Sequence, residues 1–251
     1  MAAETLGVIL AAGVGSRLRP YTDDRPKVLV AVGPRGETVL ERLAIQCRAV
    51  GMSELLLVTG HCADAVERFV AEHDLALPVR TVYNPDYDTM NNGQSLYVAR
   101  EAIGGASIVK FDGDLVLHPG ILPRLAQGTR RSTILLDDRK VLVDEDLKAQ
   151  VDPATGLVLE LGKWLPNDAS GVSIGVERID AADMDVVFDA LHRMIHVDGH
   201  TDRYYEDAYH TVVGRGLELG YATTGGLPWI EIDTESELAE GRAMAAALPA
   251  T

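Results

Sequence analysis

The feature that most constrains the fold lies near the start of the chain, where an apolar run ends in small residues. Residues 6–12 read Leu-Gly-Val-Ile-Leu-Ala-Ala, and Gly13 and Gly15 follow. This pattern is typical of a buried strand that opens into a loop. Glycines let the loop backbone approach a polyphosphate closely, and Arg17 and Lys27 beyond them can supply positive charge. We therefore predict a phosphate-holding loop after the first strand.

The spacing of the glycines argues against a dinucleotide site. That fingerprint needs a third glycine at the position of Leu18, and a carboxylate about 20 residues further on. The next strong apolar run, residues 55–58, lies too far along the chain and ends in Thr59 and Gly60. A nicotinamide or flavin site is therefore not expected.

The whole string resembles the signature of the nucleoside-diphosphate-sugar pyrophosphorylase-like nucleotidyltransferases. The residues in register are Leu10, Ala11, Ala12, Gly13, Gly15, Arg17, Leu18, Pro20, Pro26 and Lys27. In that superfamily the loop wraps the triphosphate of an incoming NTP. The resemblance implies that residues 10–13 and Gly15 bind the nucleotide, and that Arg17 and Lys27 act as catalytic residues on the phosphates near the reacting phosphorus.

Composition limits the class of protein. The 251 residues carry a net charge of −15, which argues against nucleic-acid polymers and anionic membranes as partners. The apolar stretch at the start lacks a basic region before it, so we expect no signal peptide, and no run reaches transmembrane length. Cys47 and Cys62 lie in or beside apolar patterns, and we expect buried free thiols and a cytoplasmic location. A homodimer is left open.

Strands and helices alternate along the first half of the chain. We expect strands at 54–59, 79–83 and 106–111, with helices at 38–51, 63–73 and 95–103. Further strands are expected at 132–136, 148–151, 157–161, 218–222 and 229–232, and further helices at 184–195, 204–213 and 234–248. Alternation of this kind predicts an α/β fold with a mostly parallel mixed sheet and helices on both faces.

The predicted organisation is a single domain, residues 1–251, with a Rossmann-like core (1–130 and 177–251). A β-rich insertion at about 131–176 is expected to form a small lid on the acceptor side. The resemblance implies the GT-A-like variant of this fold. Loops that follow the parallel strands should converge on one cleft at their carboxyl ends.

Two aspartates, Asp114 and Asp233, are candidates for a metal site. Asp112 and Asp114 are two residues apart at a strand end, so both point the same way in extended chain. Asp233 precedes Thr234 and Glu237, which already form a capping box and leave the Asp233 carboxylate free. The resemblance implies that Asp114 and Asp233 bind Mg²⁺, a cation that prefers carboxylates and phosphates, while we assign Asp112 to the nucleotide site.

Residues 91–97 read Asn-Asn-Gly-Gln-Ser-Leu-Tyr and can recognise a base, because amides and hydroxyls are directional donors and acceptors. An Asn-Gly turn with Ser95 capping the next helix is the simpler interpretation, and both can hold. The string resembles the CTP-using branch, which includes phosphocholine and inositol-1-phosphate cytidylyltransferases. Residues 93–95 favour the inositol type, whereas Asn91-Asn92 favours the choline or phosphonate type. We assign Asn91, Gly93, Gln94 and Ser95 to the nucleotide.

The acceptor site is expected to involve Lys163 and residues 204–207. Two tyrosines beside Glu206 and Asp207 suit a quaternary ammonium, through cation–π attraction and counter-charge. The same acids could accept hydrogen bonds from a polyol, or simply occupy the first turn of a helix. The resemblance implies that Lys163 holds the phosphate of the second substrate and that Tyr205, Glu206 and Asp207 contact the acceptor.

These features together predict a cytidylyltransferase. An oxygen of a small phosphorylated or phosphonate acceptor, with phosphocholine favoured, would attack the α-phosphorus of CTP and release pyrophosphate. The nearest alternative is a sugar-1-phosphate or inositol-1-phosphate nucleotidyltransferase, and a non-catalytic nucleotide-sensing domain is a more distant one. A glycosyltransferase is less suited, because Gly15, Arg17 and Lys27 fit a triphosphate better than a diphosphate sugar.

Overall fold

The computed structural model describes residues 5–248, so the predicted domain ends at 1 and 251 lie outside the described residues. Its strands are β1 (Thr5–Ala11), β2 (Leu55–Thr59), β3 (Val79–Tyr83), β4 (Ser107–Asp112), β5 (Leu115–Leu117), β6 (Ser132–Asp137), β7 (Lys148–Asp152), β8 (Leu157–Gly162), β9 (Gly171–Ile179), β10 (Leu219–Thr223) and β11 (Trp229–Glu231). The α-helices are α1 (Val39–Ala49), α2 (Ala63–Glu72), α3 (Asn92–Val98), α4 (Arg100–Ile103), α5 (Met184–His192), α6 (Tyr205–Val212) and α7 (Glu235–Ala247).

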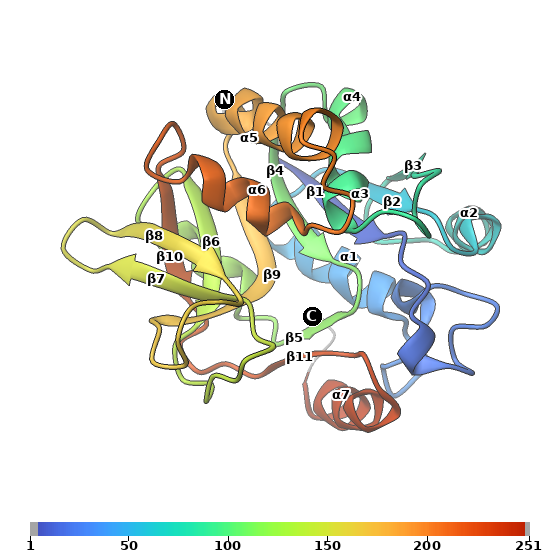
Figure 1. Cartoon of the computed structure of the whole chain (residues 1–251). Coiled ribbons are helices and arrows are strands. Elements are labelled where there is room, and N and C mark those ends of the chain that lie inside the picture. Colours follow the sequence, from blue (N-terminus) through green and yellow to red (C-terminus); the bar gives the residue numbers. More distant parts are fainter. Residues whose placement is uncertain (1–4, 249–251) are drawn as a thin grey trace.

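The predicted α/β fold is confirmed, with helices on both faces of one large sheet (Figure 1). Nine strands pair in the order β3-β2-β1-β4-β9-β6-β10-β8-β7. The strands from β3 to β4 are parallel, because each is joined to the next by a helical crossover. Beyond β4 the pairing is mixed, since β9 runs antiparallel to β4 and β6 while β10 runs parallel to β6. The sheet is therefore parallel in its first half and less so than expected in its second.

Side chains of β1 alternate between two apolar cores. Ile9 and Ala11 face the core formed with α1 and α7, whereas Val8 and Leu10 face the core formed with α3, α5 and α6. Both faces of β1 are buried, as expected for a central parallel strand. The loop after β1 therefore starts from the middle of the sheet, at the edge where the parallel strands end.

Helix boundaries follow local signals in the sequence. Both predicted capping boxes are present: Thr38 and Glu41 begin α1, and Thr234 and Glu237 begin α7. The helix expected at 95–103 starts earlier, at Asn92, because the Asn91 side chain caps it, and it divides into α3 and α4 at Ala99. Helix α5 continues into a π-helical turn, η5 (Arg193–Val197).

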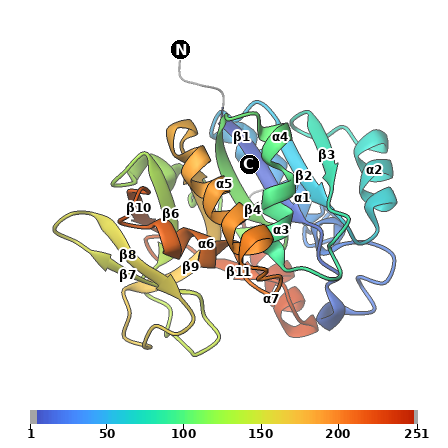
Figure 2. The same cartoon turned by 45° about the horizontal axis from the view of Figure 1, so that its top comes forward.

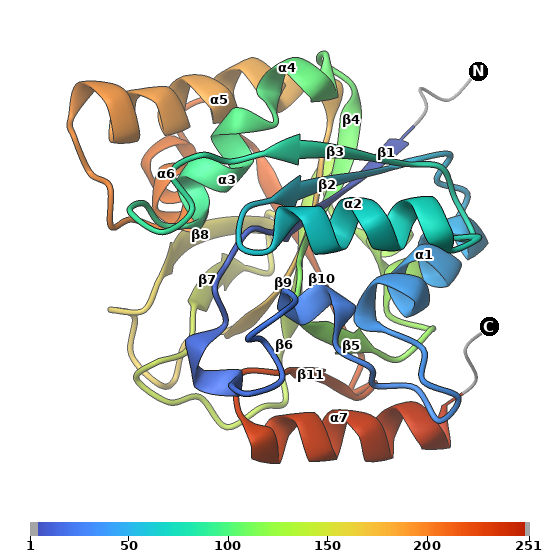
Figure 3. The same ribbon diagram turned by 90° about the vertical axis from the view of Figure 1, so that its right-hand side faces the viewer.

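A second, two-stranded sheet lies below the main one. Strand β5, which the sequence pattern did not predict, pairs antiparallel with β11, and α7 lies along this pair on the side away from α5 (Figure 3). This pairing returns the end of the chain to the carboxyl end of β4. It thereby brings Asp233 next to the residues that follow β4.

The segment expected to be an insertion, residues 131–176, shares its strands with the main sheet. Strand β6 and part of β9 stand between β4 and β10, and the hairpin of β7 and β8 extends the sheet at the end farthest from β3 (Figure 2). Strands joined by short turns pair as hairpins, which explains the antiparallel neighbours in this region. The role of the hairpin as a lid stays a prediction.

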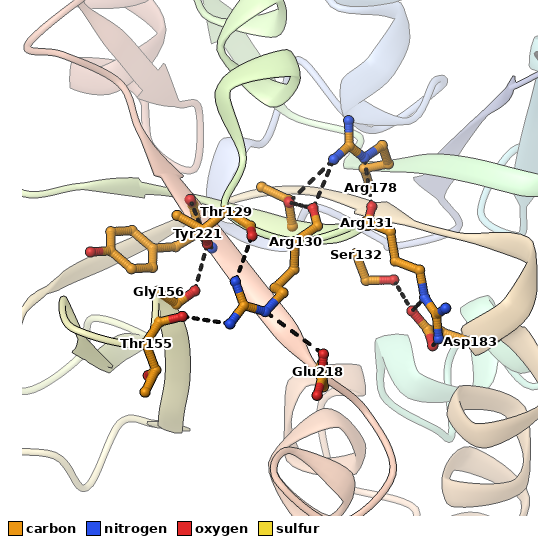
Figure 4. A network of polar contacts seen from close by, with 11 residues as sticks. Thr129, Arg130, Arg131, Ser132, Thr155, Gly156, Arg178, Asp183, Glu218 and Tyr221 are labelled. Atoms are coloured by element: carbon orange, nitrogen blue, oxygen red, sulfur yellow. Dashed lines mark hydrogen bonds and ion pairs between the residues drawn. The ribbon is translucent and has the colours of Figure 1, made fainter.

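A polar network fixes the start of β6 (Figure 4). Asp183 accepts two bonds from the Arg131 guanidinium, at 2.7 and 3.1 Å, and one from the Ser132 hydroxyl at 2.6 Å. Arg178 of β9 donates to the carbonyl oxygens of Arg130 and Arg131, at 2.9 and 2.7 Å. Because these residues lie at the beginning of β6, the network holds the sheet from the end opposite to the converging loops.

Two further findings bear on the sequence predictions. Cys47 is buried and Cys62 is half-buried, and both are free thiols, so burial is confirmed for Cys47 alone. Within residues 5–248, the helices are all too short or too polar to cross a membrane.

Candidate active site

The loop after β1 folds back on itself. Gly15 has a φ of +62°, a conformation that favours glycine, and precedes the short helix η1 (Ser16–Leu18). The Thr22 hydroxyl donates to the Gly15 carbonyl oxygen at 2.8 Å and closes the loop. A Cβ at Gly15 would lie 3.1 Å from Cγ of Lys27, so glycine also makes room for the lysine stem. Lys27 follows Pro26 and begins a second short helix, η2 (Lys27–Leu29).

Three carboxylates meet where this loop faces the end of β4. One oxygen from each of Asp114, Glu231 and Asp233 lies within 4.8 Å of the others. Pairing of β5 with β11 produces this arrangement, since the Ile232 amide donates to the Asp114 carbonyl oxygen at 3.0 Å. Gly113 allows the approach to β1, because a Cβ there would lie 2.4 Å from the Leu10 carbonyl oxygen.

The carboxylate cluster fits a hard divalent cation. Oδ1 of Asp114 is buried and has no hydrogen-bond partner among the described residues. Burial raises the pKa of Asp114 above its usual range, and repulsion from Asp114 raises the pKa of Glu231 to about 8. Carboxylates that repel one another and leave an oxygen unpaired gain from a shared cation, and Mg²⁺ prefers oxygen ligands of this kind. Asp114 and Asp233, predicted as metal ligands, are thus brought together with Glu231.

Both predicted catalytic cations of the loop contact this cluster. The Lys27 ammonium donates to Oδ2 of Asp114 at 2.7 Å and also to Asp233. Arg17 donates to Oδ2 of Asp233 at 2.5 Å. The capping-box argument for Asp233 therefore holds: its carboxylate is paired with cations, while Glu237 accepts from its backbone amide at 3.0 Å.

Two adjoining cavities border the cluster. The smaller, about 210 Å³, is lined by residues predicted for phosphate binding: Leu10, Ala11, Gly13, Gly15, Arg17 and Lys27, together with Asp114 and Asp233. The larger, about 340 Å³, is lined by Ala12, Asn91, Ser95, Asp112, Lys163, Tyr204, Glu206, Trp229 and Glu231, among others, and shares Leu10, Gly13 and Asp114 with the smaller one. After the predictions made from the sequence, we call the smaller cavity the nucleotide-phosphate side, and the part of the larger cavity around Lys163, Tyr204 and Glu206 the acceptor side.

The stretch predicted to recognise the base is only partly in the cleft. Asn91 and Ser95 line the larger cavity, but the Asn91 side chain also caps α3, at 2.8 Å from the Asn92 amide. Gly93 is buried in α3, against the Arg203 carbonyl oxygen. Gln94 points away and donates to Asp86 at 2.9 Å. Gly93 and Gln94 therefore lie outside the cleft lining, because helix α3 starts three residues earlier than expected and turns these positions inward.

The residues predicted to contact the acceptor also lie only partly in the cleft. Lys163 follows β8, and its ammonium lies 4.8 Å from the centre of the Tyr204 ring. Glu206 lines the cavity, but Asp207 accepts from the Tyr204 amide at 2.9 Å and serves as the helix cap. Tyr205 is buried, and its hydroxyl points into a polar cluster below the cavity. The simpler interpretation, acids in a first helical turn, thus applies to Asp207.

The polar cluster below the acceptor side centres on Lys110, a buried residue of β4. Its ammonium lies 2.9 Å from Glu177 of β9 and 3.1 Å from Asp112, and it contacts the Tyr205 hydroxyl. Burial opposes its charge, but the surrounding carboxylates outweigh this effect and raise the pKa of Lys110. Burial also raises the pKa of Glu177 to about 7 and that of Glu206 to about 8. Lys110 is therefore the counter-charge at the centre of a group of three acids, two of which have raised pKa values.

Sequence reasoning missed Glu231, Lys110 and Glu177. Glu231 could have been found, because it lies two residues before Asp233 and shares its face of an extended chain. Lys110 interrupts an otherwise apolar strand two residues before Asp112, which is a signal of a buried charge with a partner. Glu177 has no such signal, since only the sheet order places β9 beside β4.

Two proteins of known name are similar to this chain in sequence. The CMP-5'-(3-aminopropyl)phosphonate synthase of Streptomyces rubellomurinus is 35% identical over 127 residues, 51% of this chain and 20% of that protein. The bifunctional IPC transferase and DIPP synthase of Rubrobacter xylanophilus is 32% identical over 233 residues, 92% of this chain and 49% of that protein. The chain thus spans about half or less of the length of these relatives.

The fold is similar to that of a solved cytidylyltransferase. The structure of CTP:phosphocholine cytidylyltransferase from Streptococcus pneumoniae matches with a TM-score of 0.72 over 96% of this chain and 99% of that one, at 21% identity. The sequence profile of the MobA-like NTP transferase domain matches residues 7–145, more than half of the chain. The family resemblance seen in the loop after β1 is therefore confirmed, and the chain belongs to the MobA-like NTP transferase family.

Proposed function

We propose that the protein is a cytidylyltransferase that transfers CMP from CTP to a small phosphorylated or phosphonate acceptor. One observation carries the proposal: the loop after β1, two cations and three clustered carboxylates meet at the border of two adjoining cavities. An acceptor oxygen would attack the α-phosphorus of CTP in line, the bond to the bridging oxygen would break, and pyrophosphate would leave. Positioning and charge neutralisation suffice for such a step.

Each group of the nucleotide-phosphate side has a role in this proposal. Gly13 and Gly15 allow the backbone to approach the triphosphate, and Arg17 and Lys27 bind its oxygens. Asp114, Asp233 and Glu231 would hold Mg²⁺, which supplies positive charge to the phosphates when bound. Asn91, Ser95 and Asp112 line the larger cavity within reach of the rest of the nucleotide.

The acceptor side supports an acceptor with an anionic and a cationic end. Lys163 would bind the phosphate or phosphonate group, and Tyr204, Glu206 and Trp229 line the same cavity with aromatic faces and negative charge. An ammonium group suits such surroundings. We therefore favour phosphocholine or an aminoalkyl phosphonate. The names of relatives that act on aminopropylphosphonate and on phosphocholine agree with this choice.

A matrix of nucleotides and acceptors tests the proposal. Pyrophosphate release would be followed for each of the four NTPs with phosphocholine, 2-aminoethylphosphonate, inositol 1-phosphate and glucose 1-phosphate, with and without Mg²⁺. We expect release with CTP and a cationic acceptor, in the presence of the metal. Release with inositol 1-phosphate or glucose 1-phosphate alone would support the second candidate, the inositol- or sugar-phosphate enzyme, which the length of the match to the IPC transferase favours.

A nucleotide-sensing role predicts binding of CTP with no pyrophosphate release for any acceptor. In that case Asp114→Ala would leave cellular function intact, whereas an enzyme would lose turnover. The cytoplasmic location and a homodimer stay predictions that this assay does not address.

A further inference from the structure

Lys27 lies between two of the carboxylates that would hold a metal. Among the residues that the structure describes, it alone has its nitrogen within ion-pair distance of both Asp114 and Asp233. Arg17 pairs with the second oxygen of Asp233. The two side chains expected to bind phosphates therefore occupy three of the four oxygens of these aspartates. Oδ1 of Asp114 is the oxygen that they leave free.

The Lys27 ammonium is a stable counter-charge in this position. Its side chain is 16% exposed, and those of Asp114 and Asp233 are 15% and 17% exposed. The ammonium pairs with an oxygen of each aspartate. Its positive charge therefore screens the repulsion among carboxylates that lie within 4.8 Å of one another.

We propose that Lys27 holds the metal-binding carboxylates until nucleotide binds, and so couples the binding of metal and nucleotide. The inference rests on the proposed function for the identity of the two ligands. A divalent cation held by both aspartates takes at least one oxygen of Asp233, and Lys27 and Arg17 occupy both of these oxygens. Binding of metal alone therefore displaces a cationic side chain into a place without a partner. The triphosphate provides that partner. Each ligand then favours binding of the other, which is a coupling free energy between two sites.

The surroundings of Lys27 permit this exchange. Its stem packs beside Gly15, and both residues line the smaller cavity of about 210 Å³. A lysine side chain is a flexible four-carbon stem. The ammonium can therefore turn from the carboxylates into this cavity while the backbone of η2 stays in place. Arg17 lines the same cavity and is 69% exposed, so it can follow.

Binding of Mn²⁺ in the absence of nucleotide tests the inference. Free Mn²⁺ would be measured by electron paramagnetic resonance during titration of wild type and Lys27→Met. Removal of the competing cation should tighten Mn²⁺ binding about tenfold or more. Arg25→Met is the matched control, because Arg25 is also a loop cation but pairs with Asp24 at 2.8 Å, away from the cluster. It should change Mn²⁺ binding less than about twofold, as expected for a screened surface charge.

The double variant Lys27→Met with Asp114→Asn locates the effect. It should lose the gain in Mn²⁺ affinity, because Asp114 provides the oxygen that Lys27 releases. Arg17→Met gives a second readout in a variant whose changed side chain is mostly exposed, with an expected gain of about threefold. Thermal melting of each variant with and without Mn²⁺ reports binding independently, since a ligand of the folded state raises Tm.

Equal Mn²⁺ affinity in wild type, Lys27→Met and Arg17→Met would overturn the inference, as would a gain that survives Asp114→Asn. The result of the Mn²⁺ titration is independent of the result of the pyrophosphate-release assay that tests the proposed function. A protein that shows the Mn²⁺ response but releases no pyrophosphate contradicts the proposed transferase alone. An active transferase without the response contradicts the coupling by Lys27 alone.

Discussion

Lys27 and Lys110 each contact several carboxylates, but the two lysines differ in how tightly the surrounding structure fixes them. Lys27 lies in a loop at the nucleotide-phosphate side, partly exposed, and contacts Asp114 and Asp233. Lys110 lies in the central strand β4 with none of its side chain exposed, and it joins β4 to β9 and α6. The first can exchange its partners when a ligand arrives, whereas the second cannot move without disrupting the core.

This difference indicates how the two sides of the cleft are built. The nucleotide-phosphate side has cations on loops beside a carboxylate cluster, so its charges can rearrange around a triphosphate and a metal. The acceptor side rests on a buried network that fixes Asp112 and the start of α6 in one arrangement. We infer that the first side is adaptable and the second is rigid, and the following predictions test that distinction.

The largest expected effect is on turnover at the nucleotide-phosphate side. Asp114→Asn should lower kcat by about 10²–10³-fold, because a carboxylate at the reacting phosphates is lost while the shape is kept. Steady-state pyrophosphate release with CTP and Mg²⁺ measures it. Asp24→Asn, the same change in an exposed loop residue, should leave kcat unchanged. A kcat of Asp114→Asn close to wild type would remove the cluster from the mechanism.

The two lysines should differ most clearly in stability. Lys110→Met leaves the buried Glu177, and the partly exposed Asp112, without their counter-charge, which should lower Tm by about 10 °C. Lys27→Met should lower Tm less than half as much, because Asp233 keeps Arg17 as a partner and both aspartates line a cavity. Differential scanning calorimetry of both variants makes the comparison. Equal losses would show that the two sites do not differ in rigidity.

An effect confined to the acceptor is expected for Lys163. Lys163→Met should raise KM for the acceptor roughly tenfold and leave KM for CTP unchanged, because one charge-assisted contact is lost. Initial rates with each substrate varied in turn give both constants. Arg68→Met removes an exposed cation of α2 and should change neither. An equal rise in both KM values would place Lys163 outside a separate acceptor side.

The smallest expected effect is the dependence of stability on pH. Burial raises the pKa of Glu206 from about 4.5 to about 8. The folded state therefore holds a proton that the unfolded state loses, so the contribution to stability is present below about pH 4.5 and is lost as pH rises towards 8. Glu206→Gln should flatten the decline of Tm between pH 5 and 8. Buried Glu177 has a raised pKa as well, so part of the slope should remain. A slope unchanged by Glu206→Gln would show that this carboxyl titrates normally.

Much of the fold followed from local patterns in the sequence. Capping boxes at Thr38 and Thr234 located the starts of α1 and α7, and the apolar run before Gly13 located β1. These signals depend on neighbours within a few residues, so they can be read without knowing the tertiary structure. The segment at 131–176 was recognised as strand-rich, but the division of its strands between the middle and the far end of the sheet depends on pairing between distant strands.

The same limit applies to the site. Asp114, Asp233, Arg17 and Lys27 were predicted from a resemblance, and the fold brings all four together. That Lys27 binds both carboxylates could not be read from the chain, because the two aspartates follow strands β4 and β11, which are far apart in the sequence. Gln94 and Asp207 were predicted as substrate contacts, whereas the helices use Gln94 to donate to Asp86 and Asp207 to cap α6.

The most direct test of the two-sided cleft is a crystal structure with Mg²⁺ and the CMP-linked product formed in the assay. We expect the phosphate of CMP beside Lys27 and the predicted metal ligands Asp114 and Asp233, with the acceptor end of the product against Lys163 and Glu206. A product bound in the opposite direction, with its nucleotide on the side of Lys163 and Glu206, would contradict the assignment of the two sides of the cleft.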